Sequence, residues 1–336
     1  MKSSIAADLI ERYSQPGDLV VDPFAGAGTI PLEAALRKRR AYAADISPYA
    51  RILSIAKLHP PDSLESACLA AEHALNEASE LPKPNLTKVP AWIRQFYHPE
   101  TLREAIRFSS VVRVPGHEFL MACFLGILHH QRPGFLSFPS SHLVPYLRDK
   151  KYPRGDFPEL YQYRDLRSRL FAKIARCYKR FTPPKADTSI FHQTPVQQAT
   201  FPKHFDALIT SPPYMNALDY GRDNRLRLWF IDPRLAEPVD NDVTQRRQSF
   251  RDAITSVANH LQNGLRQGGY GVFVVGEEIK RSFEAHPSEV VSSILKEHSS
   301  ALYLEQILTD KIPDVRRTRR ECNGVKTEHF LVFKRN

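Results

Sequence analysis

Apolar residues follow two recurring patterns in residues 1–58 and 186–336: short continuous runs and longer stretches with helical spacing. Continuous apolar runs of about 4 to 8 residues are typical of strands that are buried on both faces of a parallel sheet. They predict strands at Leu19 to Val21, Ala41 to Ile46, Ser189 to His192, Ala207 to Ile209 and Gly271 to Val275. Helical spacing predicts helices over residues 4–14, Ile30 to Arg39, Phe250 to Leu265 and Ser288 to Glu297. Strands that alternate with helices predict an α/β architecture.

The chain ends with two further strand patterns, Ala301 to Leu308 and Glu328 to Phe333, which we expect to form an antiparallel pair. The predicted helix after the first strand has Leu32, Ala35 and Leu36 as its expected buried side. Gly268 and Gly269 are expected to end the helix that precedes the strand at Gly271 to Val275.

Residues 59–185 separate these two parts and follow a different pattern. Prolines divide the front of this segment, and they predict short helices and turns there. Phe119 to His129 is almost wholly apolar and predicts a buried helix. The segment from Arg164 to Arg180 predicts a helix with one apolar side, Leu166, Leu170 and Ile174, and otherwise cationic faces. The middle segment is therefore expected to be a mainly helical insertion.

Composition limits the classes of function. The chain has 47 Lys and Arg against 37 Asp and Glu, a net charge of +10, which favours a polyanionic partner. Its four cysteines are far apart and form no C-x-x-C pair, so neither a zinc site nor a disulfide framework is indicated. No apolar run approaches the length of a membrane span, and no secretory signal pattern is found. We expect a cytoplasmic protein without a metal.

A small-residue turn follows the first predicted strand, from Asp22 through Gly26 and Gly28 to Thr29. The glycines allow the backbone to approach a ligand closely, and the helix that follows presents free N–H groups at its N-terminus. The second predicted strand brings an acid, Asp45, to a position where such side chains bind ribose hydroxyls. This order of strand, glycine turn, helix, strand and acid predicts a site for a nucleoside-type cofactor.

A second motif, Thr210-Ser211-Pro212-Pro213-Tyr214, follows the strand at Ala207 to Ile209. Proline has no N–H for the sheet, so the chain must leave the sheet here. It leaves at a carboxyl end, where open α/β sheets bind ligands, and carries a hydroxyl group, fixed carbonyl groups and an aromatic ring. These groups suit a flat substrate that bears an amino group, although a plain exit from a strand has the same pattern.

Together the two motifs resemble those of S-adenosylmethionine-dependent DNA methyltransferases that modify exocyclic amino groups. Asp22 to Thr29 is similar to the family's cofactor motif, and Thr210 to Tyr214 is similar to its catalytic motif. The resemblance implies a seven-stranded Rossmann-like class I methyltransferase fold. Residues 1–58 and 186–336 would form the catalytic domain, and residues 59–185 would form a helical insertion for target recognition and DNA binding.

The resemblance also implies roles for particular residues. The cofactor would contact Asp22, Pro23, Phe24, Ala25, Gly26, Gly28, Thr29, Asp45, Ile46 and Gln193. Gln193 stands where the family commonly has an acid that contacts adenine. The flipped base and the transfer step would depend on Ser211, Pro212, Pro213 and Tyr214.

The substrate expectation follows from the first catalytic position. Ser211 resembles the cytosine-amino class, so N4-methylation of cytosine in DNA is favoured and N6-methylation of adenine is the alternative. RNA amino-methyltransferases carry a similar glycine turn, but usually have Asp-Pro-Pro-Tyr. A catalytically silent DNA-binding subunit is a further alternative, against which the intact motifs argue. A cognate restriction or defence component is a conceivable partner of such an enzyme.

Three basic segments are candidates for DNA phosphate contacts, with solvated surface as the ordinary alternative. They supply Arg164, Arg167, Lys173 and Arg176 from the insertion, Arg222 after the catalytic motif, and Arg316, Arg317, Arg319 and Arg320 between the last two strands.

Overall fold

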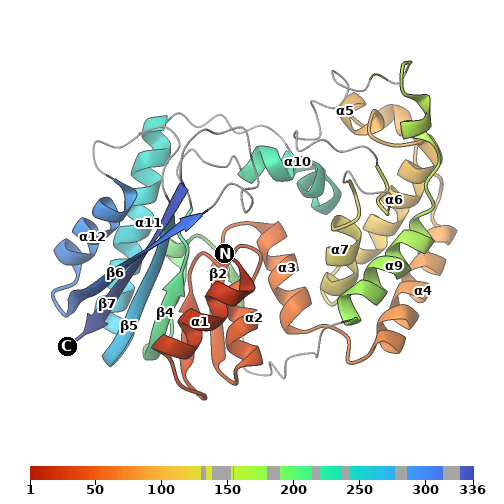
Figure 1. Cartoon of the computed structure of the whole chain (residues 1–336). Helices are drawn as coiled ribbons and strands as arrows, with labels where there is room; N and C mark the ends of the chain where they lie inside the picture. The colour runs from red at the N-terminus through yellow and green to blue at the C-terminus, as the bar shows by residue number, and fades with distance from the viewer. Residues whose placement is uncertain are drawn as a thin grey trace. The chain divides into compact units, whose positions relative to one another are not determined.

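The computed structural model describes residues 1–129, 134–137, 153, 155–179, 190–213, 220–236, 243–276, 286–312 and 326–336 (Figure 1). The seven strands are β1 (Leu19–Asp22), β2 (Arg40–Asp45), β3 (Ile190–Gln193), β4 (Phe205–Thr210), β5 (Leu265–Gly276), β6 (Leu302–Ile312) and β7 (Lys326–Arg335). The helices beside them are α1 (Ser3–Tyr13), α2 (Thr29–Leu36), α3 (Pro48–Leu58), α11 (Val243–Gly264) and α12 (Pro287–His298), with the short 3-10 turn η4 (Val196–Gln198).

The strands form one sheet in the order β3-β2-β1-β4-β5-β7-β6. The first five strands are parallel, whereas β7 is antiparallel to both β5 and β6. This is the expected seven-stranded Rossmann-like arrangement with its closing antiparallel pair. The prediction of the fold class is confirmed.

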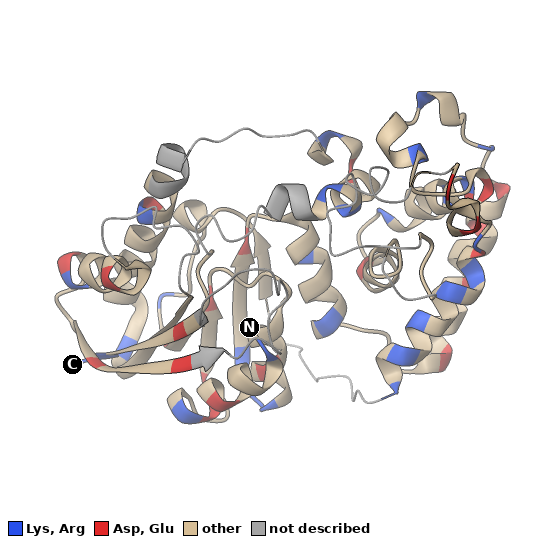
Figure 2. Cartoon of the chain, turned by 45° about the horizontal axis from the view of Figure 1, so that its top comes forward, with Lys and Arg blue, Asp and Glu red and all other residues tan. Residues whose placement is uncertain are grey.

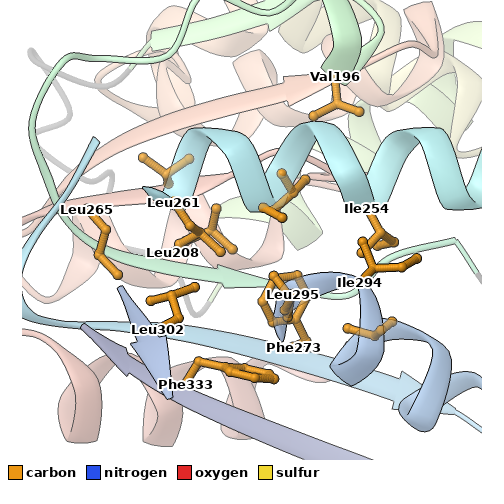
Figure 3. Packing of buried hydrophobic residues seen from close by; sticks show 14 of the residues in the cluster. Val196, Leu208, Ile254, Leu261, Leu265, Phe273, Ile294, Leu295, Leu302 and Phe333 are labelled. Carbon is orange, nitrogen blue, oxygen red and sulfur yellow. The ribbon is translucent and has the colours of Figure 1, made fainter. Parts of the chain in front are cut away.

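Alternate residues of the central strands contribute to two separate hydrophobic cores, one on each face of the sheet. In β4, Ala207 and Ile209 pack with the core beneath α1 and α2, whereas Leu208 packs with the core beneath α11 and α12. Figure 3 shows the second core, where Ile254 and Leu261 of α11 lie over the sheet. Strands with two buried faces explain why the sequence has continuous apolar runs rather than alternation.

One expectation about the sheet domain was wrong in part, and a second was wrong. In α2, Ala35 is buried as expected, but Leu36 is 41% exposed, and Ile30 and Ala34 lie on the buried side. Gly268 and Gly269 do not end α11, which ends at Gly264. They lie inside β5, where Gly268 has a φ of +72° and the register with β4 shifts. These glycines form a bulge, a role that the sequence pattern does not distinguish from a helix stop.

The chain divides into two compact units: residues 1–54, 184–219 and 240–336, and residues 55–183 and 220–239. The sequence placed residues 55–58 and 220–236 with the sheet, but they belong to the second unit. The reason lies in the helix α10 (Tyr220–Ile231), whose Leu226, Trp229 and Phe230 are buried. The ring of Phe230 makes an edge contact with Phe124 at a centroid distance of 5.2 Å.

The regular elements described in the second unit are all helical. They are α4 (Leu64–Glu80), η1 (Leu86–Lys88), α5 (Ala91–Arg94), α6 (Pro99–Val112), α7 (Glu118–Leu125), η3 (Pro158–Tyr161), α9 (Leu166–Tyr178), α10 and η5 (Pro233–Ala236). α4 is longer than the short helices expected among the prolines. The apolar helix expected to reach His129 ends at Leu125, before Gly126.

Candidate functional site

The carboxyl ends of β1, β2 and β4 lie together because β1 is the central strand of this parallel group. Val21 of β1 is in register with Tyr42 of β2 on one side and with Leu208 of β4 on the other. The two motifs that follow β1 and β4 therefore begin at neighbouring strand ends. A direct bond joins them: the Thr210 hydroxyl donates a 2.6 Å hydrogen bond to Oδ1 of Asp22.

Asp22 is a nearly fully buried carboxyl group. It is 3% exposed, and its Oδ1 also accepts a 3.2 Å hydrogen bond from the backbone N–H of Phe24. Burial raises the pKa of Asp22 to about 7, although the bonds from Thr210 and Phe24 oppose that rise. Within the described part of the chain, both bonds end on Oδ1 and none reaches Oδ2. One oxygen of this buried carboxyl group is left for a ligand.

Asp45, at the end of β2, holds the glycine turn. Its Oδ2 accepts a 2.8 Å hydrogen bond from the N–H of Gly26, and its Oδ1 accepts one of the same length from Ser47. Burial raises the pKa of Asp45, while these two backbone bonds lower it. Each carboxylate oxygen has two lone pairs, so Asp45 retains acceptor capacity for a ligand.

Gly28 shapes the end of the same turn. It has a φ of +69° and is the N-cap of α2. A Cβ built at this position would lie 2.5 Å from Oγ and 2.8 Å from Cα of Ser54 in α3. Gly28 is therefore required both by its left-handed conformation and by the close approach of α3.

The predicted cofactor residues lie around these two carboxyl groups. Pro23 and Ala25 are buried, Phe24 and Thr29 are half-buried, and Ile46 is 68% exposed. Gln193 of β3 is exposed and in register with Asp45. The sheet thus places an exposed apolar side chain and an amide close to the second carboxyl group.

The predicted catalytic motif is described as far as Pro213. Ser211 Oγ donates a 3.2 Å hydrogen bond to the carbonyl oxygen of Val274 in β5. Pro212 is buried and Pro213 is exposed. Tyr214 lies outside the described residues.

Sequence reasoning gave no role to two residues that build this site, Thr210 and Ser47. Thr210 supplies the bond between the motifs, and its signal was a hydroxyl side chain at the end of an apolar strand. The backbone N–H of Ser47 donates a hydrogen bond to Oδ1 of Asp45. The signal for that bond was the order Asp45-Ile46-Ser47-Pro48, since an Asp side chain commonly accepts from the N–H two residues later.

The predicted DNA-binding residues of the insertion have different environments. Arg164 is partly buried, and its Nη1 donates to the carbonyl oxygen of Phe135. Burial, followed by the nearby Arg169, lowers the pKa of Arg164. Arg167 forms an ion pair with Glu72 of α4. Both arginines therefore have partners inside the protein.

Lys173 and Arg176 lie on α9, where Leu166, Leu170 and Ile174 form the buried side as expected. Figure 2 shows Lys and Arg residues repeated along this helix. Arg176 is exposed and Lys173 is half-buried. Arg222 lies in α10 with its side chain outside the described part, and Arg316, Arg317, Arg319 and Arg320 lie outside the described residues.

Two thiols of the second unit form a pair. Cys123 of α7 is buried, and its side chain is hydrogen-bonded to Cys177 of α9. The bond from Cys123, with Lys173 and Arg176 nearby, lowers the pKa of Cys177 to about 6 despite partial burial.

In the described residues, no helix is both long and apolar enough to cross a membrane. The same residues contain no group of three or more His, Cys, Asp or Glu side chains arranged to hold a metal ion.

Comparison with protein families gives a match over residues 3–56 to the family described as DNA methylase. This match confirms the predicted resemblance to DNA amino-methyltransferases. The matched segment contains the glycine turn and Asp45. It is the segment in which the cofactor site was predicted, so the match supports S-adenosylmethionine as the cofactor. No curated protein matches the chain in sequence.

Several solved structures are similar to the chain at low identity. TrmN from Thermus thermophilus has 12% identity and a TM-score of 0.39, and the match covers all of this chain and 49% of that one. The chain thus spans about half the length of TrmN. An S-adenosylmethionine-dependent methyltransferase from Methanosarcina mazei has 10% identity, coverage of 97% and 96%, and a TM-score of 0.38. NodS from Bradyrhizobium japonicum, solved with S-adenosylhomocysteine, has 14% identity, coverage of 50% and 62%, and a TM-score of 0.26.

Proposed function

We propose that this protein transfers a methyl group from S-adenosylmethionine to the exocyclic N4 amino group of a cytosine in DNA. The observation that carries the proposal is the position of the two motifs at neighbouring carboxyl ends of β1 and β4, joined by Thr210 and Asp22. Open α/β sheets bind their ligands at such strand ends. The DNA methylase match supports DNA as the substrate.

The residues at this edge fit the cofactor. Asp22 is a buried carboxyl group with one oxygen that accepts no bond from a described residue, and a cationic ligand group would compensate its burial. We assign the ammonium group of the methionine part to Asp22 and the ribose hydroxyls to Asp45. The exposed Ile46 would cover one face of the adenine, and Gln193 would bond to its edge. The cofactor supplies an electrophilic methyl group on a sulfonium centre.

The remaining cofactor contacts come from the turn itself. Phe24, Ala25, Gly26, Gly28 and Thr29 would place their backbone against the methionine part, with Pro23 fixing the direction in which the turn leaves β1. The N–H groups of Phe24, Ala25, Gly26 and Gly28 already donate hydrogen bonds within the protein. The N–H of Thr29, the first residue of α2, suits the carboxylate of that part.

The catalytic motif would hold the target base. Duplex DNA hides the amino group, so the base must leave the stack, at a cost of about a few kcal/mol. The Pro212 carbonyl group and Ser211 Oγ would accept hydrogen bonds from the amino group and direct its lone pair towards the methyl group. Pro213 would stiffen the segment, and Tyr214 would stack on the base. Positioning of this kind supplies up to about 7 to 11 kcal/mol of a barrier.

We assign phosphate contacts to the cationic face of α9, first to Lys173 and Arg176. Arg164 and Arg167, which have partners within the protein, would contribute less unless DNA displaces those partners. Arg222 and the four arginines at 316, 317, 319 and 320 remain part of the proposed DNA surface. The expected partner is a cognate restriction or defence component, and the methylation would protect DNA from it.

The proposal is tested by transfer of radiolabelled methyl groups from S-adenosylmethionine to DNA and, separately, to RNA. We expect label in DNA and its loss in Pro212→Ala, with cofactor binding retained. Pro202→Ala, a change of the same type just before β4, is the matched control and should keep activity. Label in RNA alone would favour an RNA amino-methyltransferase, and cofactor binding without transfer to either would favour a silent subunit.

A further inference from the structure

Thr210 occupies a position where a strand buried on both faces would ordinarily carry an apolar side chain. It is the last residue of β4 and is fully buried. A buried hydroxyl group lowers stability unless it is hydrogen-bonded, and Val has nearly the same shape. The Thr210 hydroxyl has such a partner, because it donates a 2.6 Å hydrogen bond to Oδ1 of Asp22 in the neighbouring strand β1.

This bond selects one oxygen of Asp22. The N–H of Phe24 also donates to Oδ1, so two hydrogen bonds from different directions orient the carboxyl group through this one oxygen. Oδ2 receives no hydrogen bond from the described residues and is the oxygen available to a ligand. The other charged groups that act on Asp22 are Asp45, which disfavours its ionised form, and the amino terminus, which favours it.

We infer that Thr210 is a positioning residue: its hydroxyl orients Asp22 so that Oδ2 receives the cationic ammonium group of the cofactor's methionine part. The inference rests on the proposed cofactor site. It gives Thr210, the first residue of the proposed catalytic motif, a role in cofactor binding. Hydrogen bonds from Thr210 and Phe24 also favour the ionised carboxylate against the effect of burial. Loss of the hydroxyl should therefore weaken binding of a cation and raise the pKa of Asp22.

The test compares Thr210→Val with Thr210→Ser by calorimetry, using two probes. S-adenosylhomocysteine has the amino-acid part, whereas methylthioadenosine has the nucleoside and sulfur but no ammonium group. We expect Thr210→Val to weaken S-adenosylhomocysteine binding by about tenfold to a hundredfold, the range for loss of a hydrogen bond to a charged group. Methylthioadenosine affinity should stay within about twofold of the parent, and Thr210→Ser should restore most of the S-adenosylhomocysteine affinity.

A second measurement needs no ligand. The pKa of Asp22 in the free protein can be followed by NMR of 13C-labelled carboxyl groups, with Asp22→Asn to assign the signal. We expect Thr210→Val to raise this pKa and Thr210→Ser to leave it near the parent value.

The outcomes separate the inference from the proposed function. Equal weakening of both probes, or an unchanged Asp22 pKa in Thr210→Val, would overturn the positioning role. A parent protein that binds neither probe would remove the cofactor site itself, together with the inference. Selective loss of S-adenosylhomocysteine binding with a raised pKa supports both.

Discussion

Asp45 Oδ2 accepts a 2.8 Å hydrogen bond from the backbone N–H of Gly26, so the end of β2 fixes the turn that follows β1. The same carboxyl group caps Ser47 through Oδ1. A residue expected only to bind ribose thus also maintains the shape of the glycine turn. Changes at this position should affect both stability and cofactor binding.

Asp45→Ala should lower the free energy of unfolding by about 1 to 3 kcal/mol, because two backbone donors lose their acceptor. It should also weaken S-adenosylmethionine binding. Chemical denaturation and calorimetry measure the two effects. The matched control is Asp18→Ala, which removes an acceptor from the N–H of Gln15 at the other end of β1. If the control weakens cofactor binding as much as Asp45→Ala does, the ribose assignment is wrong.

Gly28→Ala should destabilise the fold by about 2 to 5 kcal/mol, because the left-handed backbone and the close approach of Ser54 both oppose a Cβ. Gly268→Ala separates the two causes. Gly268 has nearly the same φ, +72°, but no atom within 4 Å of a built Cβ. The free energy of unfolding of Gly268→Ala should fall by only about 1 to 2 kcal/mol. Equal losses in urea unfolding would show that the proximity of Ser54 has no effect.

The stability of the free protein should depend on the ionisation of Asp22. Its pKa is raised from 3.8 to about 7, so in the window between these values the folded state holds a proton that the unfolded state has lost. Stability should therefore fall as pH rises through this window, by about 4 kcal/mol in total. Asp22→Asn should remove this part of the pH dependence. A parent and variant whose unfolding free energies differ by a constant amount at every pH would contradict the raised pKa.

The cationic face of α9 gives a prediction about salt. Lys173→Gln combined with Arg176→Gln should weaken DNA binding on all sequences and lower the salt slope by about 0.9 for each phosphate that the variant no longer neutralises. Arg12→Gln with Lys296→Gln removes the same formal charge from α1 and α12 and serves as the control. Fluorescence anisotropy at several salt concentrations measures both. Identical slopes for the two double variants would assign the effect to net charge alone.

Cys177 should react with iodoacetamide at a lower pH than an ordinary cysteine, because its pKa is lowered to about 6 by the bond from Cys123. Cys123→Ser keeps a hydroxyl donor, whereas Cys123→Ala removes it and should raise the pH at which Cys177 is labelled. Mass spectrometry of the labelled peptides measures the change. The same labelling profile in parent and Cys123→Ala would disprove the dependence on the thiol pair.

The sequence predicted the sheet and its order of motifs because strands buried on both faces leave continuous apolar runs. Ser211, Pro212 and Pro213 stood out as candidate site residues because Pro cannot continue a strand. The sequence did not predict that α10 belongs to the second unit, because its apolar residues Leu226 and Phe230 could pack against any helix. It also missed the Thr210–Asp22 bond, which joins residues 188 positions apart and depends on which strands are adjacent.

The most direct test of the proposed activity is mass spectrometry of nucleosides from DNA treated with the protein and S-adenosylmethionine that carries a deuterated methyl group. The label distinguishes new methyl groups from those already in the DNA. The proposal predicts deuterated N4-methylcytosine, absent from reactions with Pro212→Ala. Deuterated N6-methyladenine as the only product would contradict the cytosine assignment, and label found only in RNA would contradict DNA as the substrate.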